Sequence, residues 1–189
     1  MPSFGPDTAR ILIVGLAPGL KGAHRTGRPF TGDASGELLF ATLGRFGFTQ
    51  GTFGNATNDG VQLNDVMITN AVRCVPPQNK PNAAEINACR QFLIGRINAM
   101  AKLEIVLILG RVAHESALKA FSLNVKDFPF GHGARYALSH KGRNLTLLSS
   151  YHCSRYNVNT RRLTPDMFDD IFKAAKTILQ DGVQSGSTR

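Results

Sequence analysis

Short apolar runs alternate along the chain with longer segments in which apolar residues recur every three or four positions. The runs are bounded by turn-forming residues and are too short to be helices, so each predicts a buried β-strand. Four strands are expected, at Ala9–Val14, Val66–Val72, Glu104–Leu109 and Leu145–Ser149.

The longer segments have helical spacing and lie between and after these strands. They span Ser35–Phe46, Ala83–Met100, Gly110–Phe121 and Pro165–Leu179. Asn82, with Glu85 three residues on, predicts a capped start of the second helix, and Thr164 before Pro165 predicts the start of the last. Strands and helices alternate, which predicts an α/β fold: a three-layer α/β/α sandwich with a mainly parallel, four-stranded central sheet. Ligands bind such sheets at the carboxyl ends of the strands.

Two internal segments do not fit this alternation. Gln50–Asn64 carries turn residues throughout and is expected to be a surface loop or a hairpin. Lys126–Arg143 is expected to form an irregular hairpin ahead of the fourth strand, and the tail Asp181–Arg189 to be frayed. A chain of 189 residues can bury one good core. We therefore expect a single domain over residues 1–189, with its core at about 9–181.

Composition adds a basic charge to this picture. The 22 Lys and Arg against 13 Asp and Glu give a net charge of +9 and a pI near 9.9. This balance favours a polyanionic partner, nucleic acid above all. No apolar run approaches the roughly 20 residues of a membrane span, and no apolar signal segment begins the chain. We expect a cytoplasmic monomer with no membrane partner. An odd number of cysteines, three, argues against a disulfide framework.

Residues whose side chains can bind a ligand or take part in a reaction cluster after three of the predicted strands. The segments are "GLAPGLKGAHRTGRPFTGD", "NAVRCVPPQNKP" and "YHCSRYNVNTRRL". Carboxyl ends of parallel strands meet at one edge, so the three segments would converge on one crevice. A Gly-rich loop after a first strand can cradle a phosphate or simply turn the chain. It is neither G-x-G-x-x-G nor followed by G-K-[ST], so no nucleotide cofactor is expected.

Together these segments resemble uracil-DNA glycosylases of family 5 (type b). The similarity runs from about Ile11 to about Phe172, through "GLAPG", "RTGRPFTGD", "ITNAVRCVPPQNKP" and "YHCSRYNVNTRRLTPDMF" in that order. Family 4 enzymes share the R-P-F loop but usually carry a glutamate where this chain has Leu16. The resemblance implies a uracil-DNA glycosylase-like fold and hydrolysis of the N-glycosidic bond of uracil in single- or double-stranded DNA. It also implies that other deaminated bases, such as hypoxanthine, are accepted.

A base held outside the stack needs an aromatic platform and polar groups at its edge. Phe30 is the candidate platform, the alternative being a core phenylalanine. Asn70 can both donate and accept, as uracil requires, the alternative being an asparagine that stabilises a turn. Gly15 and Ala17 would complete the base pocket by letting the backbone approach the base.

Cleavage places negative charge on the departing uracil and leaves an oxocarbenium-like sugar. A catalyst can donate a hydrogen bond to O2 of uracil and place a carboxylate near the cation and the water. His152 would be the donor, although a lone histidine is more often structural. The resemblance implies that Asp33 is the carboxylate. The alternative is that Asp33 caps the helix beginning near Ala34, and one residue can serve both roles. No lysine in the motifs is an obvious Schiff-base nucleophile, so a monofunctional enzyme is expected.

Basic and aromatic residues beside the motifs are candidates for DNA contacts that weaken with salt. The candidates are Arg25, Arg155, Tyr156, Asn157 and Arg161, with Lys21, His24 and Arg162 as further cations. Tyr156 or a neighbour would fill the gap left by the base. Any single cation of this set is more often a solvated surface charge than a DNA contact. Two alternatives are a catalytically silent nucleic-acid-binding module of the same fold and a small-molecule enzyme that binds a nucleotide, which the missing phosphate motifs disfavour.

The resemblance also implies a [4Fe–4S] cluster on four cysteines. Cys74 and Cys89 fit the later pair of that ligand set. The earlier pair would precede the first strand, and no cysteine is found there. Either the sequence lacks an upstream segment, which we favour, or the cluster has been lost. Cys153 stands where relatives commonly carry a proline after the motif histidine.

Overall fold

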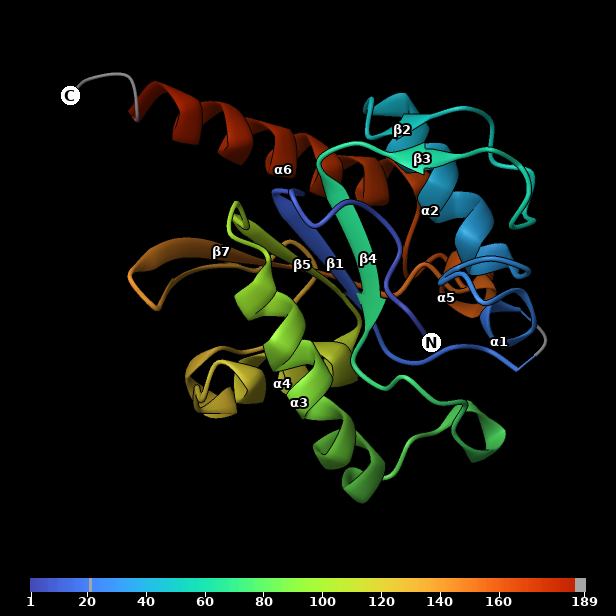
Figure 1. The fold of residues 1–189 in the computed structure, drawn as a ribbon, viewed down its shortest axis with the longest axis horizontal. Coiled ribbons are helices and arrows are strands. Elements are labelled where there is room, and N and C mark those ends of the chain that lie inside the picture. The colour runs from blue at the N-terminus through green and yellow to red at the C-terminus, as the bar shows by residue number, and fades with distance from the viewer. Residues whose placement is uncertain (21, 186–189) are drawn as a thin grey trace.

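The computed structural model describes residues 1–20 and 22–185, and a five-stranded sheet lies at its centre (Figure 1). The strands are β1 (Ile11–Gly15), β4 (Val66–Asn70), β5 (Ile105–Leu109), β6 (Arg135–His140) and β7 (Arg143–Ser150). Their order across the sheet is β4-β1-β5-β7-β6. The first four in that order run parallel, and β6 pairs antiparallel with β7. The predicted mainly parallel α/β sandwich is confirmed.

The predicted number of four strands in the central sheet is wrong by one. The additional strand, β6, lies inside the Lys126–Arg143 segment, where an irregular hairpin was expected. It is an edge strand in which Leu138 alone is buried, so it has no apolar run that would mark it in the sequence. The addition of β6 does not change the four parallel strands. Their carboxyl ends still lie together at one side of the sheet, as predicted.

Two layers of helices cover the sheet (Figure 1). The layers consist of α2 (Ala34–Arg45) with α6 (Pro165–Ser185), and α3 (Ala83–Ala99) with α4 (Arg111–Ala120). Alternate residues of β1 pack against opposite helix layers. Ile11 and Ile13 lie in the core beneath α2 and α6, whereas Leu12 and Val14 lie in the core beneath α3 and α4. Burial on both faces is why the parallel strands are continuous apolar runs in the sequence.

Short elements connect this framework. They are α1 (Ala23–Thr26), β2 (Thr49–Gln50), β3 (Gln62–Leu63), α5 (Arg155–Asn159) and the 3₁₀ turns η1 (Pro77–Asn79) and η2 (Val125–Asp127). Because β2 and β3 pair antiparallel, the Gln50–Asn64 segment is a hairpin, one of its two expected forms. No helix among the described residues is long and apolar enough to cross a bilayer.

Capping explains where two of the long helices begin. The Asn82 side chain accepts from the Glu85 amide across 2.9 Å, and the Glu85 carboxylate accepts from the Asn82 amide across 2.8 Å, which is the predicted capping box of α3. The Thr164 hydroxyl accepts from the Met167 amide at the start of α6. The expected fraying from Asp181 is wrong as far as Ser185, because α6 continues to that residue. Residues 186–189 of the predicted tail lie outside the described part of the chain.

The first residues of the chain lie along the outer edge of β4. Phe4 forms an antiparallel bridge with Ile68, and the Ser3 and Thr69 hydroxyls are hydrogen bonded across 3.0 Å. The amino group of Met1 then donates to the carbonyl oxygen of Arg73 across 2.9 Å. The edge of the parallel sheet is thereby covered.

Candidate active site

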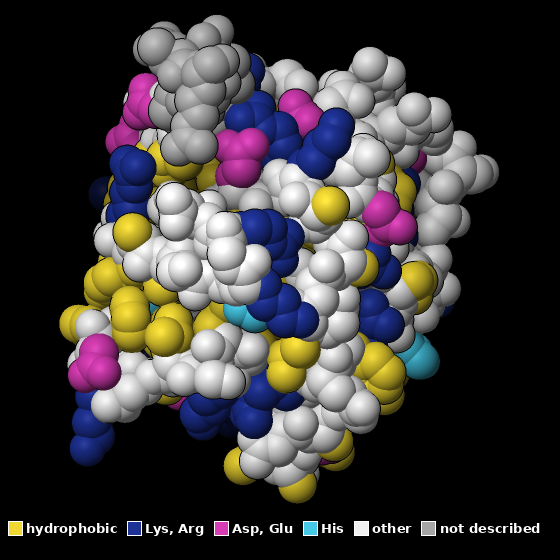
Figure 2. Space-filling model, turned by 60° about the vertical axis from the view of Figure 1, so that its left-hand side comes forward, with side chains coloured by type: hydrophobic (Ala, Val, Ile, Leu, Met, Phe, Trp, Pro, Cys, Tyr) yellow, Lys and Arg dark blue, Asp and Glu magenta, His cyan; other side chains and the backbone are white. Residues whose placement is uncertain are grey.

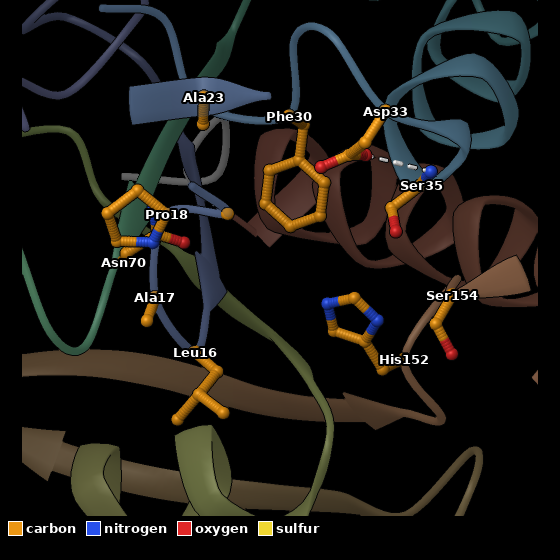
Figure 3. A pocket seen from close by; sticks show the side chains of 11 residues that line it. Leu16, Ala17, Pro18, Ala23, Phe30, Asp33, Ser35, Asn70, His152 and Ser154 are labelled. Carbon is orange, nitrogen blue, oxygen red and sulfur yellow. Dashed lines mark hydrogen bonds between the residues drawn. The ribbon is translucent and has the colours of Figure 1, made fainter. Parts of the chain in front are cut away.

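A cavity of about 360 Å³ opens at the carboxyl ends of the parallel strands (Figure 3). Its lining comes from the loop after β1, the end of β4 and the segment after β7. The lining residues are Leu16, Ala17, Pro18, Gly19, Ala23, Phe30, Asp33, Ser35, Asn70, His152 and Ser154. Five residues predicted from the three separate motifs are therefore brought together: Ala17, Phe30, Asp33, Asn70 and His152.

Gly15, the sixth predicted pocket residue, lies behind the wall of the cavity. A Cβ atom on Gly15 would stand 2.5 Å from Oδ1 of Asn70 and 2.8 Å from two ring carbons of Phe30. Such distances are well inside van der Waals contact, so a side chain here would displace both residues. The glycine is thus required for the packing of Phe30 against Asn70.

Phe30 lies in a left-handed backbone conformation, with φ of +53°. A bulky residue in this region is strained by about 1–3 kcal/mol and is held there only by its surroundings. Its ring faces the cavity, while 7% of the residue remains exposed. Phe30 is therefore packed in the protein and also faces the cavity. The two interpretations of this residue, a platform for the base and a core phenylalanine, are compatible.

Asp33 is the N-cap of α2. Its Oδ1 accepts from the amides of Ser35 at 2.9 Å and Gly36 at 3.2 Å. Its Oδ2 faces Gly22 across the first loop, since a Cβ on Gly22 would lie 3.0 Å from that atom. One oxygen thus stabilises the helix, and the carboxylate as a whole lines the cavity. The capping interpretation is confirmed.

His152 lies across the cavity from the first loop (Figure 3). Its ring centroid is 5.9 Å from that of Phe30, with 26° between the ring planes. Burial lowers the pKa of His152, and the nearby charge of Asp33 opposes this effect. A neutral imidazole still carries one N–H, so the residue keeps the ability to donate a hydrogen bond.

The segment after β7 is held by contacts on both sides of His152. The Asn157 amide Nδ2 donates to the His152 carbonyl oxygen across 2.8 Å. The Cys153 thiol is buried and donates to the Ser35 carbonyl oxygen across 3.4 Å. Asn157, predicted as a DNA contact, therefore has its side chain turned to the protein, and Cys153 ties the histidine segment to the start of α2.

Three further residues that support the site had no assignment from sequence. His132 Nδ1 accepts from the Tyr151 amide across 3.2 Å, directly ahead of His152. Arg28 forms a buried ion pair with Asp59 of the hairpin, with 6% and 5% of the two side chains exposed. That pair holds the pKa of Asp59 well below its usual range. Asp59 lies 31 residues along the chain in a turn-rich segment, and no spacing signal links it to the site.

The candidate DNA contacts lie mainly on α1 and α5, which flank the same side of the molecule (Figure 1). Arg25, Arg155, Tyr156 and Arg161 are all exposed, Tyr156 to 72%. Lys21 lies outside the described residues. His24 is exposed, and the Arg162 guanidinium lies 4.9 Å from the Tyr151 ring centroid. Basic side chains are also spread over the face in Figure 2, whereas the described residues that line the cavity include no Lys or Arg.

The cysteines supply only part of a ligand set for an iron–sulfur cluster. Cys74 is exposed and Cys89 is half-buried. Cys153 is buried, and its thiol is hydrogen bonded to the Ser35 carbonyl oxygen. Within residues 1–20 and 22–185, no group of three or more His, Cys, Asp or Glu side chains is arranged to hold a metal. A [4Fe–4S] cluster normally takes four thiolates, so the residues of this chain do not complete its site.

Comparison with known proteins agrees with the motifs and the geometry. The sequence model of the uracil DNA glycosylase superfamily matches residues 2–176. A type-5 uracil-DNA glycosylase of Thermus thermophilus is 43% identical over 178 residues, which cover 94% of this chain and 80% of that protein. One of Mycobacterium bovis is 39% identical over 180 residues, covering 94% and 66%, and a type-4 enzyme of Sulfurisphaera tokodaii is 29% identical over 180 residues, covering 94% and 75%. The chain belongs to the uracil DNA glycosylase superfamily, within its type-5 group.

Proposed function

We propose that this protein is a uracil-DNA glycosylase that hydrolyses the bond between uracil and deoxyribose in DNA, releasing the free base and leaving an abasic site. The observation that carries the proposal is the meeting of Phe30, Asn70, Asp33 and His152 around one cavity. Its volume of about 360 Å³ is at the small end for ligand pockets, which suits a single flipped nucleotide.

Binding of the base follows from two of these residues. The uracil ring stacks on Phe30, whose ring faces the cavity. The Asn70 amide offers an acceptor for N3–H of uracil and a donor for the adjacent carbonyl. Asn70 lies at the end of β4 and is 5% exposed, so its hydrogen bonds to a base would form in a largely dry environment.

Asp33 and His152 take part in cleavage of the glycosidic bond. When the C1′–N1 bond breaks, its electron pair stays with uracil and spreads to O2, where the His152 N–H donates a hydrogen bond. The sugar becomes an oxocarbenium-like cation, which the Asp33 carboxylate stabilises. Asp33 also accepts a proton from the water that attacks C1′. That proton then passes through solvent to the uracil anion, which leaves neutral uracil and returns Asp33 to its carboxylate form.

The geometry favours an enzyme over a catalytically silent binding module. Such a module would be expected to have a pocket filled by bulky side chains, whereas the cavity here is open and lined by short residues from Ala17 to Gly19. Exposed Arg25, Arg155 and Arg161 are proposed to contact DNA phosphates.

Cys74 and Cys89 remain proposed as half of a cluster ligand set. No step above depends on a cluster, because each group that contacts the base, the sugar or the water is a side chain of the described cavity. Iron and acid-labile sulfide measured on the purified protein test this part independently of activity. Iron at well under one atom per chain, in protein that also carries an upstream C-x-x-C segment, contradicts it.

One experiment tests the function directly. The protein is incubated with single- and double-stranded oligonucleotides that carry one uracil, and alkali then cleaves at any abasic site. Strand cleavage at uracil, and none at a thymine in the same position, is expected. Absence of cleavage with both oligonucleotides would contradict the function, and undiminished cleavage by Asp33→Ala and His152→Ala would contradict the mechanism.

A further inference from the structure

The segment Arg28–Asp33 carries both the stacking ring and the carboxylate of the site, yet it contains no helix or strand. The following inference rests on the proposed function and concerns what holds this segment in place. Phe30, at its centre, is the strained residue with φ of +53°. A strained residue keeps its conformation only where neighbouring contacts enforce it.

Arg28 supplies contacts on the N-terminal side of Phe30. Its guanidinium donates to both carboxylate oxygens of Asp59, across 2.8 and 2.7 Å, and its Nε donates to the Thr31 hydroxyl across 2.8 Å. The residue thus binds the hairpin and, at the same time, the position that follows Phe30. A planar, bidentate guanidinium fixes direction as well as distance.

Aromatic rings enclose the guanidinium on the remaining sides. The centroids of Phe4, Phe40 and Phe53 lie 5.2, 5.5 and 5.4 Å from its central carbon. These rings come from the N-terminal segment, α2 and the β2–β3 hairpin. Exclusion of water strengthens the ion pair, and the pair is costly to break because either charge would then be buried alone.

The hairpin contacts the segment a second time, on the C-terminal side of Phe30. The Asn55 side-chain oxygen accepts from the Gly32 amide across 2.5 Å. Asp59 is itself fixed, since its carboxylate accepts from the Gly54 and Val61 amides at 2.9 and 3.0 Å. The hairpin therefore contacts the chain on both sides of Phe30.

We propose that Arg28, Asp59 and Asn55 are positioning residues for base excision, which hold Phe30 in its left-handed conformation so that its ring faces the flipped base. The β2–β3 hairpin, which contributes no residue to the lining of the cavity, thereby acts on the site through the backbone of Phe30. Without these contacts the backbone relaxes toward negative φ and turns the ring away from the base.

The test compares two oligonucleotides that differ in whether a base is present. One carries 2′-fluoro-2′-deoxyuridine, which resists hydrolysis, and the other carries a tetrahydrofuran abasic analogue. In Asp59→Asn and Arg28→Lys we expect affinity for the fluorouridine DNA to fall by about tenfold while affinity for the abasic DNA stays within about twofold, because only the former has a base to stack. The single-turnover rate of uracil release should fall by about 10²-fold.

Arg45→Lys and Asp169→Asn are the matched controls. Arg45 also forms a two-pronged ion pair with an aspartate, at 2.5 and 3.2 Å, and joins α2 to α6 without lining the cavity. Both control variants should keep the rate and the affinity ratio of the unmodified protein. Thermal unfolding checks that each variant is folded at the assay temperature, and Asn55→Ala, which removes one neutral hydrogen bond, replaces Asp59→Asn if that variant is not.

The outcomes separate this inference from the proposed function. If the unmodified protein releases no uracil, the proposed function is contradicted. The ratio of its affinities for fluorouridine DNA and abasic DNA would still report on stacking of a base on Phe30. An active unmodified protein whose folded Asp59→Asn, Arg28→Lys and Asn55→Ala variants keep its rate and affinity ratio overturns the inference. Equal weakening on both oligonucleotides overturns it as well, because a general loss of structure would not distinguish a base from its absence.

Discussion

The rings of Phe30 and His152 lie on either side of the cavity, with centroids 5.9 Å apart and planes inclined by 26°. A base sandwiched between two rings needs about 6.8 Å, twice the roughly 3.4 Å spacing of stacked bases. The separation is smaller than that, so uracil can stack on Phe30 and meet His152 only at its edge. An edge contact is what a hydrogen bond from the imidazole to O2 of uracil requires.

The two roles of Asp33 can be separated by substitution. An asparagine in its place would keep an oxygen that caps α2 and lose the charge, so Asp33→Asn should lower the uracil release rate by about 10²–10⁴-fold with little change in the free energy of unfolding. Asp33→Ala should lose the same activity and a further ~1 kcal/mol of stability. Single-turnover rates and urea unfolding measure the two effects. An Asp33→Asn variant with full activity would remove Asp33 from the mechanism.

Gly15→Ala should weaken binding of the base. The new methyl group would stand 2.5 Å from Oδ1 of Asn70 and 2.8 Å from the Phe30 ring, so one of them must move. Gly95→Ala in α3 is the control, because a Cβ there meets nothing within 4 Å and the helix gains up to about 1 kcal/mol. We expect about tenfold weaker affinity for fluorouridine DNA in the Gly15 variant alone, and equal affinities in both variants would refute the packing argument.

Stability should fall as the pH drops below about 6.5. His114 is fully buried, with Nδ1 against the Ser149 hydroxyl and Nε2 against the Phe128 carbonyl, both at 2.8 Å. Burial lowers its pKa from the ordinary 6.5, and burial also lowers the pKa of His132 and His152. The unfolded chain therefore binds protons at a higher pH than the folded one, and stability that is complete above pH 6.5 is lost as the pH falls toward the lowered folded-state values. Urea unfolding between pH 8 and about pH 5 measures this slope, which should be shallower in His114→Gln; an unchanged slope would assign the effect elsewhere.

The three thiols should react in two groups. Cys74 is exposed and Cys89 half-buried, whereas Cys153 is 1% exposed and burial raises the pKa of its thiol. In metal-free protein at mildly alkaline pH, a disulfide reagent should modify Cys74 and Cys89. Cys153 should stay unmodified until urea unfolds the chain. Peptide mass spectrometry identifies the modified residues. Rapid modification of Cys153 in folded protein would contradict its place in the core.

Arg161→Ala should weaken DNA binding by a similar factor for all sequences. If its exposed guanidinium contacts a phosphate, the slope of log affinity against log salt should decrease in magnitude by about one. Arg45→Ala, on the far end of α2 from the cavity, should leave the slope unchanged. Fluorescence anisotropy of a labelled oligonucleotide over a series of salt concentrations measures both. Identical slopes for the two variants would exclude Arg161 as a contact.

The residues of the site were predictable because each stands at the end of an apolar strand or in a motif next to one. Asn70 closes β4, and His152 follows β7 by two residues. What supports them was not predictable. Asp59 meets Arg28 through a hairpin whose sequence shows only turn residues, and β6 has a single buried residue to mark it. Asn157 looked like a surface contact because its hydrogen bond is to the His152 backbone, which carries no sequence signal.

The hydrogen bond from Met1 to Arg73 bears on how the protein is best handled in the laboratory. A purification tag fused ahead of Met1 would begin beside Arg73, next to Cys74 and close to the strand that ends in Asn70. The last helix, α6, ends at Ser185 on the opposite side of the molecule from α1 and α5 (Figure 1). Fusion or surface attachment through the C-terminus therefore leaves both the proposed DNA-facing side and the Cys74 segment accessible.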